Sequence, residues 1–225
     1  LVYRPFHLNE RNYLYLADRG RIYGDVRLYD DQGTGIHFYT NREDTIADQE
    51  MTVELSRIDL KQFKKVLPYL PDVEGWLGGS LHYVDSEGQM MLSADMNLDN
   101  FVYEKSPLGN WTMSGAYLPG DNNAHHVDGF ITYNDQEIIY MNGVYQADET
   151  GQENITGELE LQHFPLRVIN PFIPEKMVAF TGDIDGTLSM TGSPMKPVLN
   201  GGLQLDSVLM IMPDMSVGFR FDNKQ

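Results

Sequence analysis

Apolar and polar residues alternate along most of the 225-residue chain. A period of two is typical of half-buried antiparallel strands, because successive side chains of a strand point to opposite faces of the sheet. The alternation predicts an all-β chain of about twelve strands. Two short helical turns interrupt it. The first begins at Asp59 with Leu60, Phe63 and Leu67 on one face and stops at Pro68. The second begins at Pro165 and ends at Pro171.

Glycine recurs inside these alternating segments, as in Leu77-x-Gly79-x-Leu81. Four of these glycines follow one another at intervals of fourteen residues, namely Gly115, Gly129, Gly143 and Gly157. That spacing fits a strand plus a turn, repeated as a meander that keeps equivalent positions on one face. Interior glycine usually marks a bend or bulge in a sheet, and it also leaves room for another backbone or an acyl chain. The glycines concerned are Gly24, Gly79, Gly115, Gly129, Gly143, Gly157, Gly186 and Gly201.

A longer repeat overlies this pattern. Residues 75–101 match 182–208 at an offset of 107, and the similarity continues upstream at an offset of 106. We therefore expect one elongated domain, 1–225, with internal repeat units 52–106 and 158–213. Each unit is predicted to contain a strand, a short helix, a strand, a turn and a strand.

About twelve strands, each with one apolar face, must either close into a sandwich or leave an apolar trough. Periodicity alone does not separate these two outcomes. Methionine occupies many strand positions where Val or Ile is the usual β-former, Met96, Met141 and Met190 among them. Its flexible, polarizable side chain suits a surface that accepts irregular apolar partners, although it also fills gaps in ordinary cores.

Charge and composition exclude several classes. With 33 acidic and 16 basic residues the formal charge is −17, so the chain lacks the clustered cations that nucleic acids require. Cysteine is absent, which excludes disulfides and thiolate metal sites. The longest apolar run, Val208 to Met212, is far shorter than the roughly 20 residues of a spanning helix. Since the chain begins at Leu1 without a leader pattern, we expect a mature product or a piece of a longer protein.

Catalytic chemistry is difficult to find in the sequence. The pair His125-His126 follows an Asn-rich turn, and Asp183 and Asp185 flank Ile184 on the polar side of a predicted strand. Neither group has the partner spacing of a metal site, and no nucleophile elbow or nucleotide-binding loop is present. We expect a protein that is not an enzyme and that binds no metal or cofactor.

The second repeat unit carries the most specific sequence signal. It contains LELQHFPLRVINPF at 159–172 and GDIDGTLSMTGSPMKPVLNGGL at 182–203. These segments resemble the repeat of TamB-type translocation and assembly proteins, in which a strand and a leucine-rich turn precede a Gly-x-Ile-x-Gly-x-Leu segment and a proline motif.

The resemblance implies an elongated antiparallel sheet curled into an open groove, a β-taco, with an apolar concave face and a polar outside. It implies a periplasmic segment of a bridge protein anchored in the bacterial inner membrane. Such a segment would shield phospholipid or other acyl chains for transport to the outer membrane, or for protein assembly there. The expected protein partner is an outer-membrane barrel of the BamA or TamA type.

No catalytic or ligand residue transfers individually from this family. The expected groove lining is the apolar set within the strands, namely Leu77, Leu81, Met96, Ile131, Tyr133, Met141, Leu159, Leu161, Ile184, Leu188, Met190, Leu203 and Leu205. The alternative is a non-catalytic β-sandwich or solenoid that presents strand edges to protein partners in the cell envelope.

Overall fold

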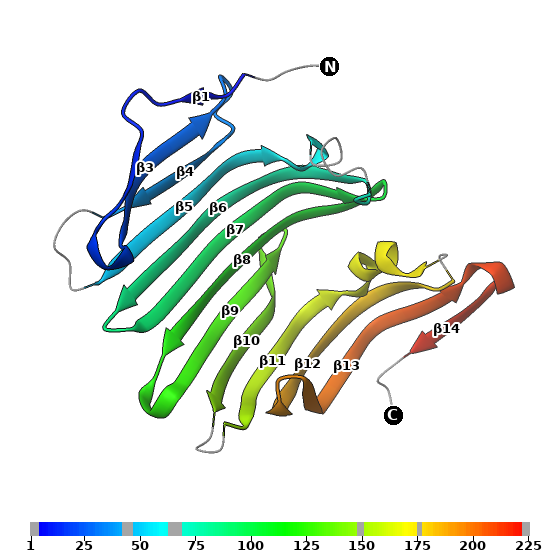
Figure 1. Ribbon diagram of the computed structural model, residues 1–225. Coiled ribbons are helices and arrows are strands. Elements are labelled where there is room, and N and C mark those ends of the chain that lie inside the picture. The colour runs from blue at the N-terminus through cyan, green and yellow to red at the C-terminus, as the bar shows by residue number, and fades with distance from the viewer. Residues whose placement is uncertain (1–4, 42–46, 63–68, 148–150, 175–176, 222–225) are drawn as a thin grey trace.

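The chain forms one antiparallel sheet of fourteen strands (Figure 1). The computed structural model describes residues 5–41, 47–62, 69–147, 151–174 and 177–221. From β3 onward, strands that follow each other in sequence are hydrogen-bonded neighbours, and the first and last strands do not pair, so the sheet is not closed. The prediction of an all-β open groove is confirmed. The strand number exceeds the predicted twelve because two short strands, β1 and β2, both pair with β3 at the N-terminal edge.

The strands are shortest at the two edges of the sheet, with two residues in β1 and five in β14, and reach 17 residues in β13. Their bounds are β1 (His7–Leu8), β2 (Tyr13–Leu16), β3 (Ile22–Tyr29), β4 (Gly35–Thr40), β5 (Gln49–Asp59), β6 (Val73–Ser86), β7 (Gln89–Tyr103), β8 (Ser106–Pro119), β9 (Ala124–Tyr133), β10 (Gln136–Ala147), β11 (Glu153–Pro165), β12 (Ala179–Ser193), β13 (Lys196–Met212) and β14 (Val217–Phe221). The 3-10 turns are η1 (Asp18–Gly20), η2 (Leu60–Gln62), η3 (Asp121–Asn123), η4 (Leu166–Phe172) and η6 (Pro213–Met215).

The register of the strands separates apolar from polar side chains. Directly opposed positions share a face of the sheet, and one row of such positions crosses eleven strands without a polar member. It consists of Leu28, Ile36, Leu55, Gly79, Met96, Met113, Ile131, Ile139, Leu161, Gly186 and Leu203. A row on the opposite face begins with Arg27, His37, Glu54, Ser80, Asp95 and Ser114. We call these two surfaces the apolar face and the polar face.

Strands β5–β7 and β11–β13 share their irregularities as well as their order. The pairing register shifts between Leu55 and Ile58, and again between Leu161 and Phe164, 106 residues later. Arg57 and His163, the residues inside these two bulges, have φ of 48° and 45°. A bulge adds one residue without a partner and bends its strand. The shifts restore the apolar residues to their own face, since Ile58 opposes Leu77 and Phe164 opposes Ile184.

Glycines on the apolar face allow the sheet to bend. Gly79 has φ of 134°, a conformation that side chains disfavour, and an added Cβ would lie 2.1 Å from the backbone oxygen of Asp95. Gly186 repeats the arrangement, with φ of 152° and a Cβ position 2.2 Å from the backbone oxygen of Gly202. All eight glycines of the sequence pattern lie on the apolar face, which agrees with the prediction that they share one face.

The sheet curls toward its apolar face. Three strands lie between β7 and β11, so the two are four strand spacings apart, about 19 Å in a flat sheet. Nevertheless the ring of Tyr103, at the end of β7, lies 4.5 Å from the ring of Phe172 in η4, the turn that follows β11. In Figure 1 η4 is the yellow coil beside the upper ends of β7 and β8. This contact brings two distant parts of the sheet together over the apolar face.

The helical turns differ from the predicted ones in their extent. The first is the 3-10 turn Leu60–Gln62, while Phe63, Leu67 and Pro68 lie outside the described residues. In the second, Pro165 is the last residue of β11, and Pro171 lies inside η4 instead of ending it. A short 3-10 turn tolerates this proline because its φ fits the turn and only one backbone donor is lost.

Replacing Gly79 by alanine should destabilise the protein by roughly 1–3 kcal/mol, because the backbone conformation becomes strained and the new Cβ meets a carbonyl oxygen. Gly202→Ala is the matched control, since its Cβ would meet nothing within 4 Å on the polar face. Urea unfolding followed by circular dichroism measures both variants. Equal stability of the two would contradict this account of the bend.

Candidate functional site

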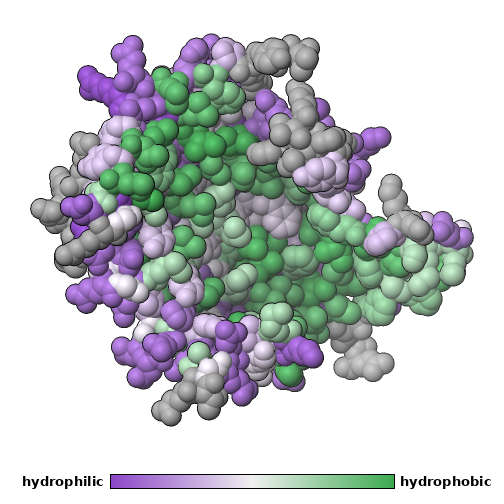
Figure 2. All heavy atoms as spheres, viewed as in Figure 1, coloured by the Kyte–Doolittle hydropathy of each residue, from purple (hydrophilic) through white to green (hydrophobic). Residues whose placement is uncertain are grey.

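The apolar face is left largely uncovered. Within the described residues only a few large apolar side chains are buried, namely Leu108, Ile138, Leu166, Val168 and Val208. Other apolar side chains on this face remain accessible, with Met113 48% exposed, Leu203 46% and Leu199 56%. Figure 2 shows apolar residues gathered over the face in view, from the region of β3–β5 across to β13 and β14, with polar residues at its margin. The single sheet therefore forms a trough, and the sandwich alternative does not hold.

A cavity in the trough lies between η4 and strands β6–β9. We call this cavity the inner hollow, and its volume is about 500 Å³. Twelve of its fourteen lining residues are apolar. The lining consists of Leu77, Met96, Asn97, Leu98, Phe101, Leu108, Trp111, Thr112, Met113, Ile131, Phe164, Val168, Ile169 and Phe172. A hollow of this size and composition is in the range that binds small apolar ligands.

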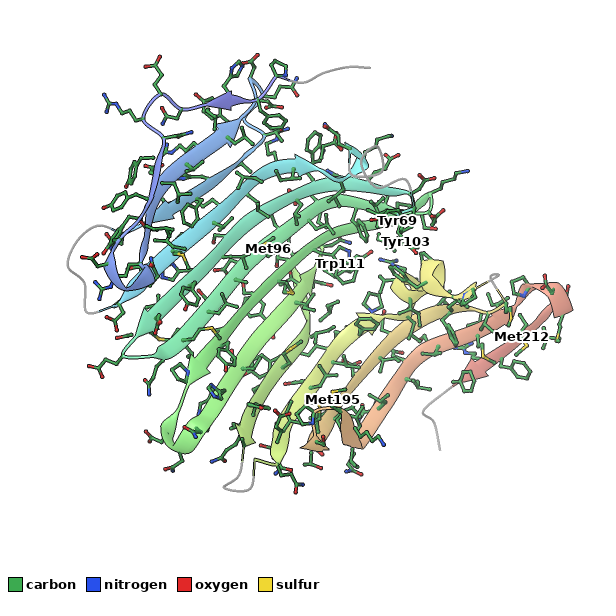
Figure 3. All side chains as sticks on the ribbon, viewed as in Figure 1. Tyr69, Met96, Tyr103, Trp111, Met195 and Met212 are labelled. Carbon is green, nitrogen blue, oxygen red and sulfur yellow. The ribbon has the colours of Figure 1, made fainter. Side chains whose placement is uncertain are left out.

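Residues of η4 and β8 form one end of the inner hollow. Leu108 of β8 and Val168 of η4 are each 4% exposed, and both line the hollow. Trp111 Nε1 donates a hydrogen bond to the backbone oxygen of Leu108 at 2.8 Å, which fixes the indole at this end. In Figure 3 Trp111 and Tyr103 are labelled beside η4. Leu108 and Val168 thus form part of the roof of the trough, whereas the two most buried apolar side chains among the described residues, Ile138 and Val208, lie on β10 and β13.

Polar contacts hold η4 in place from the other side. The side chain of Asn170 donates to the backbone oxygen of Phe180 at 2.8 Å and accepts from its backbone nitrogen at 2.7 Å. This paired arrangement mimics one rung of a strand ladder and ties η4 to β12. The guanidinium of Arg167 lies 5.8 Å from the ring centre of Tyr133 on β9, a cation–π distance. The turn is therefore attached to the strands on both sides of the trough.

A second cavity, the outer hollow, continues the trough away from η4. Its volume is about 220 Å³, and it shares Met113 and Ile131 with the inner hollow. Gly115 and Gly129 oppose each other on its floor and contribute no side chains. The outer hollow extends along β8 as far as Tyr117. Together the two hollows form a path that runs along the strands from η4 to the opposite rim of the sheet.

Aromatic side chains gather at that opposite rim. The rings of Tyr117 and His125 are stacked at 5.2 Å, and His125 lies 5.9 Å from Tyr145. A hydrogen bond to the Glu153 carboxylate raises the pKa of Tyr145. His125 Nδ1 is buried and has no hydrogen-bond partner in the described part of the chain. We call Tyr117, His125 and Tyr145 the aromatic rim.

All thirteen residues of the predicted lining lie on the apolar face. Three of them, Leu77, Met96 and Ile131, line the inner hollow, and Met141 lines the outer hollow together with Ile131. Tyr133 opposes Trp111. The remaining members continue the apolar face over β6 and β11–β13, and they are Leu81, Leu159, Leu161, Ile184, Leu188, Met190, Leu203 and Leu205.

The sequence reasoning missed the roof of the inner hollow. Val168, Ile169 and Phe172 belong to the second helical turn, and none of them is in the predicted lining. Leu98 and Trp111 follow the same alternation as the predicted lining, so periodicity could have identified them. Nothing local in the sequence indicates that η4 reaches β7 and β8.

The titratable candidates do not assemble into a metal site. Asp185 accepts from the backbone nitrogen of His163 at 2.8 Å and lies 3.0 Å from its ring Nδ1, while Asp183 opposes Asp206. Across the described ranges, no group of three or more His, Asp or Glu side chains could hold a metal ion. His37 lies between Asp25 and Glu54 at 2.9 and 3.2 Å, on the polar face.

No protein-family model matches the chain, and the searches of curated proteins and of solved structures found no match either. Among the residues that the structure describes, no helix has the length and apolar character needed to span a membrane.

Truncating Leu108 to alanine should lower the free energy of unfolding by about 2–5 kcal/mol, because the change leaves a cavity where η4 packs on β8. Leu199→Ala removes the same atoms from an exposed position on the apolar face and should change stability by only about 0.5 kcal/mol. Urea titrations monitored by fluorescence compare the two variants. A larger effect at Leu199 would show that the most stabilising contacts lie elsewhere.

Proposed function

We propose that this chain shields acyl chains in its apolar trough and acts as a segment of a TamB-like lipid carrier. The observation that supports this most directly is the row of apolar positions across eleven strands, which no second layer covers in the described structure. Monomeric proteins rarely expose so large a continuous apolar surface, and such surfaces usually mark a binding site.

The mechanism is partition and not reaction. Each methylene group that moves from water into the trough contributes about 0.8 kcal/mol, so the affinity comes from the length of chain that is covered. The ligand's polar group needs no buried partner, since the trough is open along its length. The same property allows a bound chain to move along the trough, because neighbouring positions on the apolar face are chemically alike.

The proposed cellular setting rests on the resemblance of the second repeat unit to the TamB-type repeat. Proteins with this repeat are bridge-like carriers of the bacterial envelope, and on that basis we place the chain in the periplasm. There it would take phospholipid from the inner membrane side toward an outer-membrane barrel of the BamA or TamA type. Transport of phospholipid and assistance in outer-membrane protein assembly are both compatible with a trough that covers apolar surface.

A second function, protein interaction through a strand edge, is favoured by the end of the sheet at β13. Strand β14 pairs only with Val208 to Met212, so Lys196–Ser207 has no neighbour on its outer side among the described strands. An unpaired edge presents backbone donors and acceptors to an extended peptide. In this alternative the apolar face would cover a polypeptide and not a lipid.

Protein purified without detergent should carry acyl chains, which solvent extraction and mass spectrometry can count per protein molecule. Met113→Asp and Leu203→Asp should each reduce that number, because they place a carboxylate on the apolar face. Gly202→Asp is the control, since it adds the same charge next to Leu203 but on the polar face.

Wild-type protein that is folded yet free of acyl chains would overturn the proposal. Equal loss of lipid in Gly202→Asp and Leu203→Asp, with circular dichroism unchanged, would show that net charge and not the apolar face controls binding.

A further inference from the structure

We infer that a phospholipid acyl chain lies along the strands with its methyl end in the inner hollow, beneath η4, and its glycerol end at the aromatic rim. This inference rests on the proposed function and adds a position and a direction to it. The terminal part of an acyl chain occupies the inner hollow. The junction between that chain and the polar headgroup lies at the aromatic rim, formed by Tyr117, His125 and Tyr145.

The chemistry of the inner hollow selects the methyl end. Its side chains are apolar except for Asn97 and Thr112. These two residues occupy strand positions that belong to the polar face. A phosphate or glycerol group placed there would lose its hydration without gaining hydrogen-bond partners, which costs several kcal/mol. A methyl end loses nothing in the same place. Val168 and Leu108, which line the hollow beneath η4 and are each 4% exposed, make this end of it apolar.

The length of the path fits one acyl chain. Trp111 and Tyr117 are six residues apart on β8, a rise of about 20 Å. An acyl chain spans one leaflet, half of a hydrocarbon core of about 30 Å, so roughly 15 Å. A chain whose methyl end lies beside Trp111 therefore reaches just past Gly115 and ends about 5 Å short of Tyr117 along the strand, which leaves that distance for the ester and glycerol groups. The glycine floor gives the chain direct access to the backbone at the middle of this path.

The aromatic rim suits the junction between chain and headgroup. Tyrosine rings lie at the boundary between an apolar phase and water because one end of the side chain is apolar and the other is polar. The buried Nδ1 of His125, which lacks a partner among the described residues, would find one in a lipid ester carbonyl at this level. Beyond the rim Asp121 and Glu153 add negative charge, so the headgroup meets water and carboxylates.

The two tryptophans of the chain permit a direct test of the direction. Trp111 lines the inner hollow, whereas Trp76 opposes Asp59 and Asp99 on the polar face. Bromine quenches indole fluorescence on contact. The test uses phosphatidylcholine brominated either near the glycerol or near the methyl end of its acyl chains, loaded from vesicles onto the Trp76→Phe variant. Bound phospholipid is counted in each sample.

We expect the methyl-end label to quench Trp111 strongly and the glycerol-end label to leave its emission close to that of unlabelled lipid. The Trp111→Phe variant retains only Trp76 and should respond to neither label. The wild-type protein provides a second measurement, in which only the Trp111 part of the emission should be lost.

Stronger quenching by the glycerol-end label would reverse the direction and overturn the inference. Equal quenching by both labels would overturn it too, since the chain would then lie across the strands or move freely. In either case counted lipid would show that the proposed function stands. Absence of both bound lipid and quenching would instead refute the proposed function.

Discussion

The structure depends on keeping apolar side chains on one face of a single sheet while that face stays largely uncovered. Most β proteins bury such a face against a second layer. Here the described residues contain no second sheet, and backbone hydrogen bonds between neighbouring strands hold most of the structure together. Any slip of one residue in register would move apolar groups to the solvated face. The bulges at Arg57 and His163 are therefore tolerated only because the next apolar residue returns to the correct side.

The curl of the sheet and the contact of η4 with β7 and β8 follow from the same constraint. A flat sheet would leave both ends of the trough open to water. By packing Leu166 and Val168 out of solvent, η4 covers part of the apolar face without filling it. Many acidic residues of the strands lie on the polar face, Glu54, Asp95, Asp128, Glu160 and Asp185 among them. Charge repulsion between like molecules then opposes association through the exposed apolar surface.

The alternation along the chain was sufficient to predict an all-β chain and the face on which Leu188, Met190 and Leu203 lie, because a period of two determines which side chains share a face. The open groove was expected from the family resemblance, because the alternation alone does not separate it from a sandwich. The inner hollow was not predictable in this way. Its walls come from positions as far apart as Leu77 and Phe172, and their proximity depends on how strongly the sheet bends. That bend comes from glycine conformations such as that of Gly79, whose consequences appear only in three dimensions. The extent of η4 was likewise missed, because Pro171 resembles a helix terminator in sequence and is accommodated inside a 3-10 turn.

The matching bulges in β5 and β11 also restrict how the groove can change in length. Neighbouring strands run in opposite directions, and the two bulged strands are six strands apart, an even number that corresponds to about 29 Å of sheet. Insertion of a single strand would reverse every later strand and move the turn after β11 to the opposite rim. Only hairpins, inserted or deleted whole, leave both 3-10 turns on the same side of the trough. Evolutionary variants and engineered versions of this architecture should therefore differ in length by even numbers of strands.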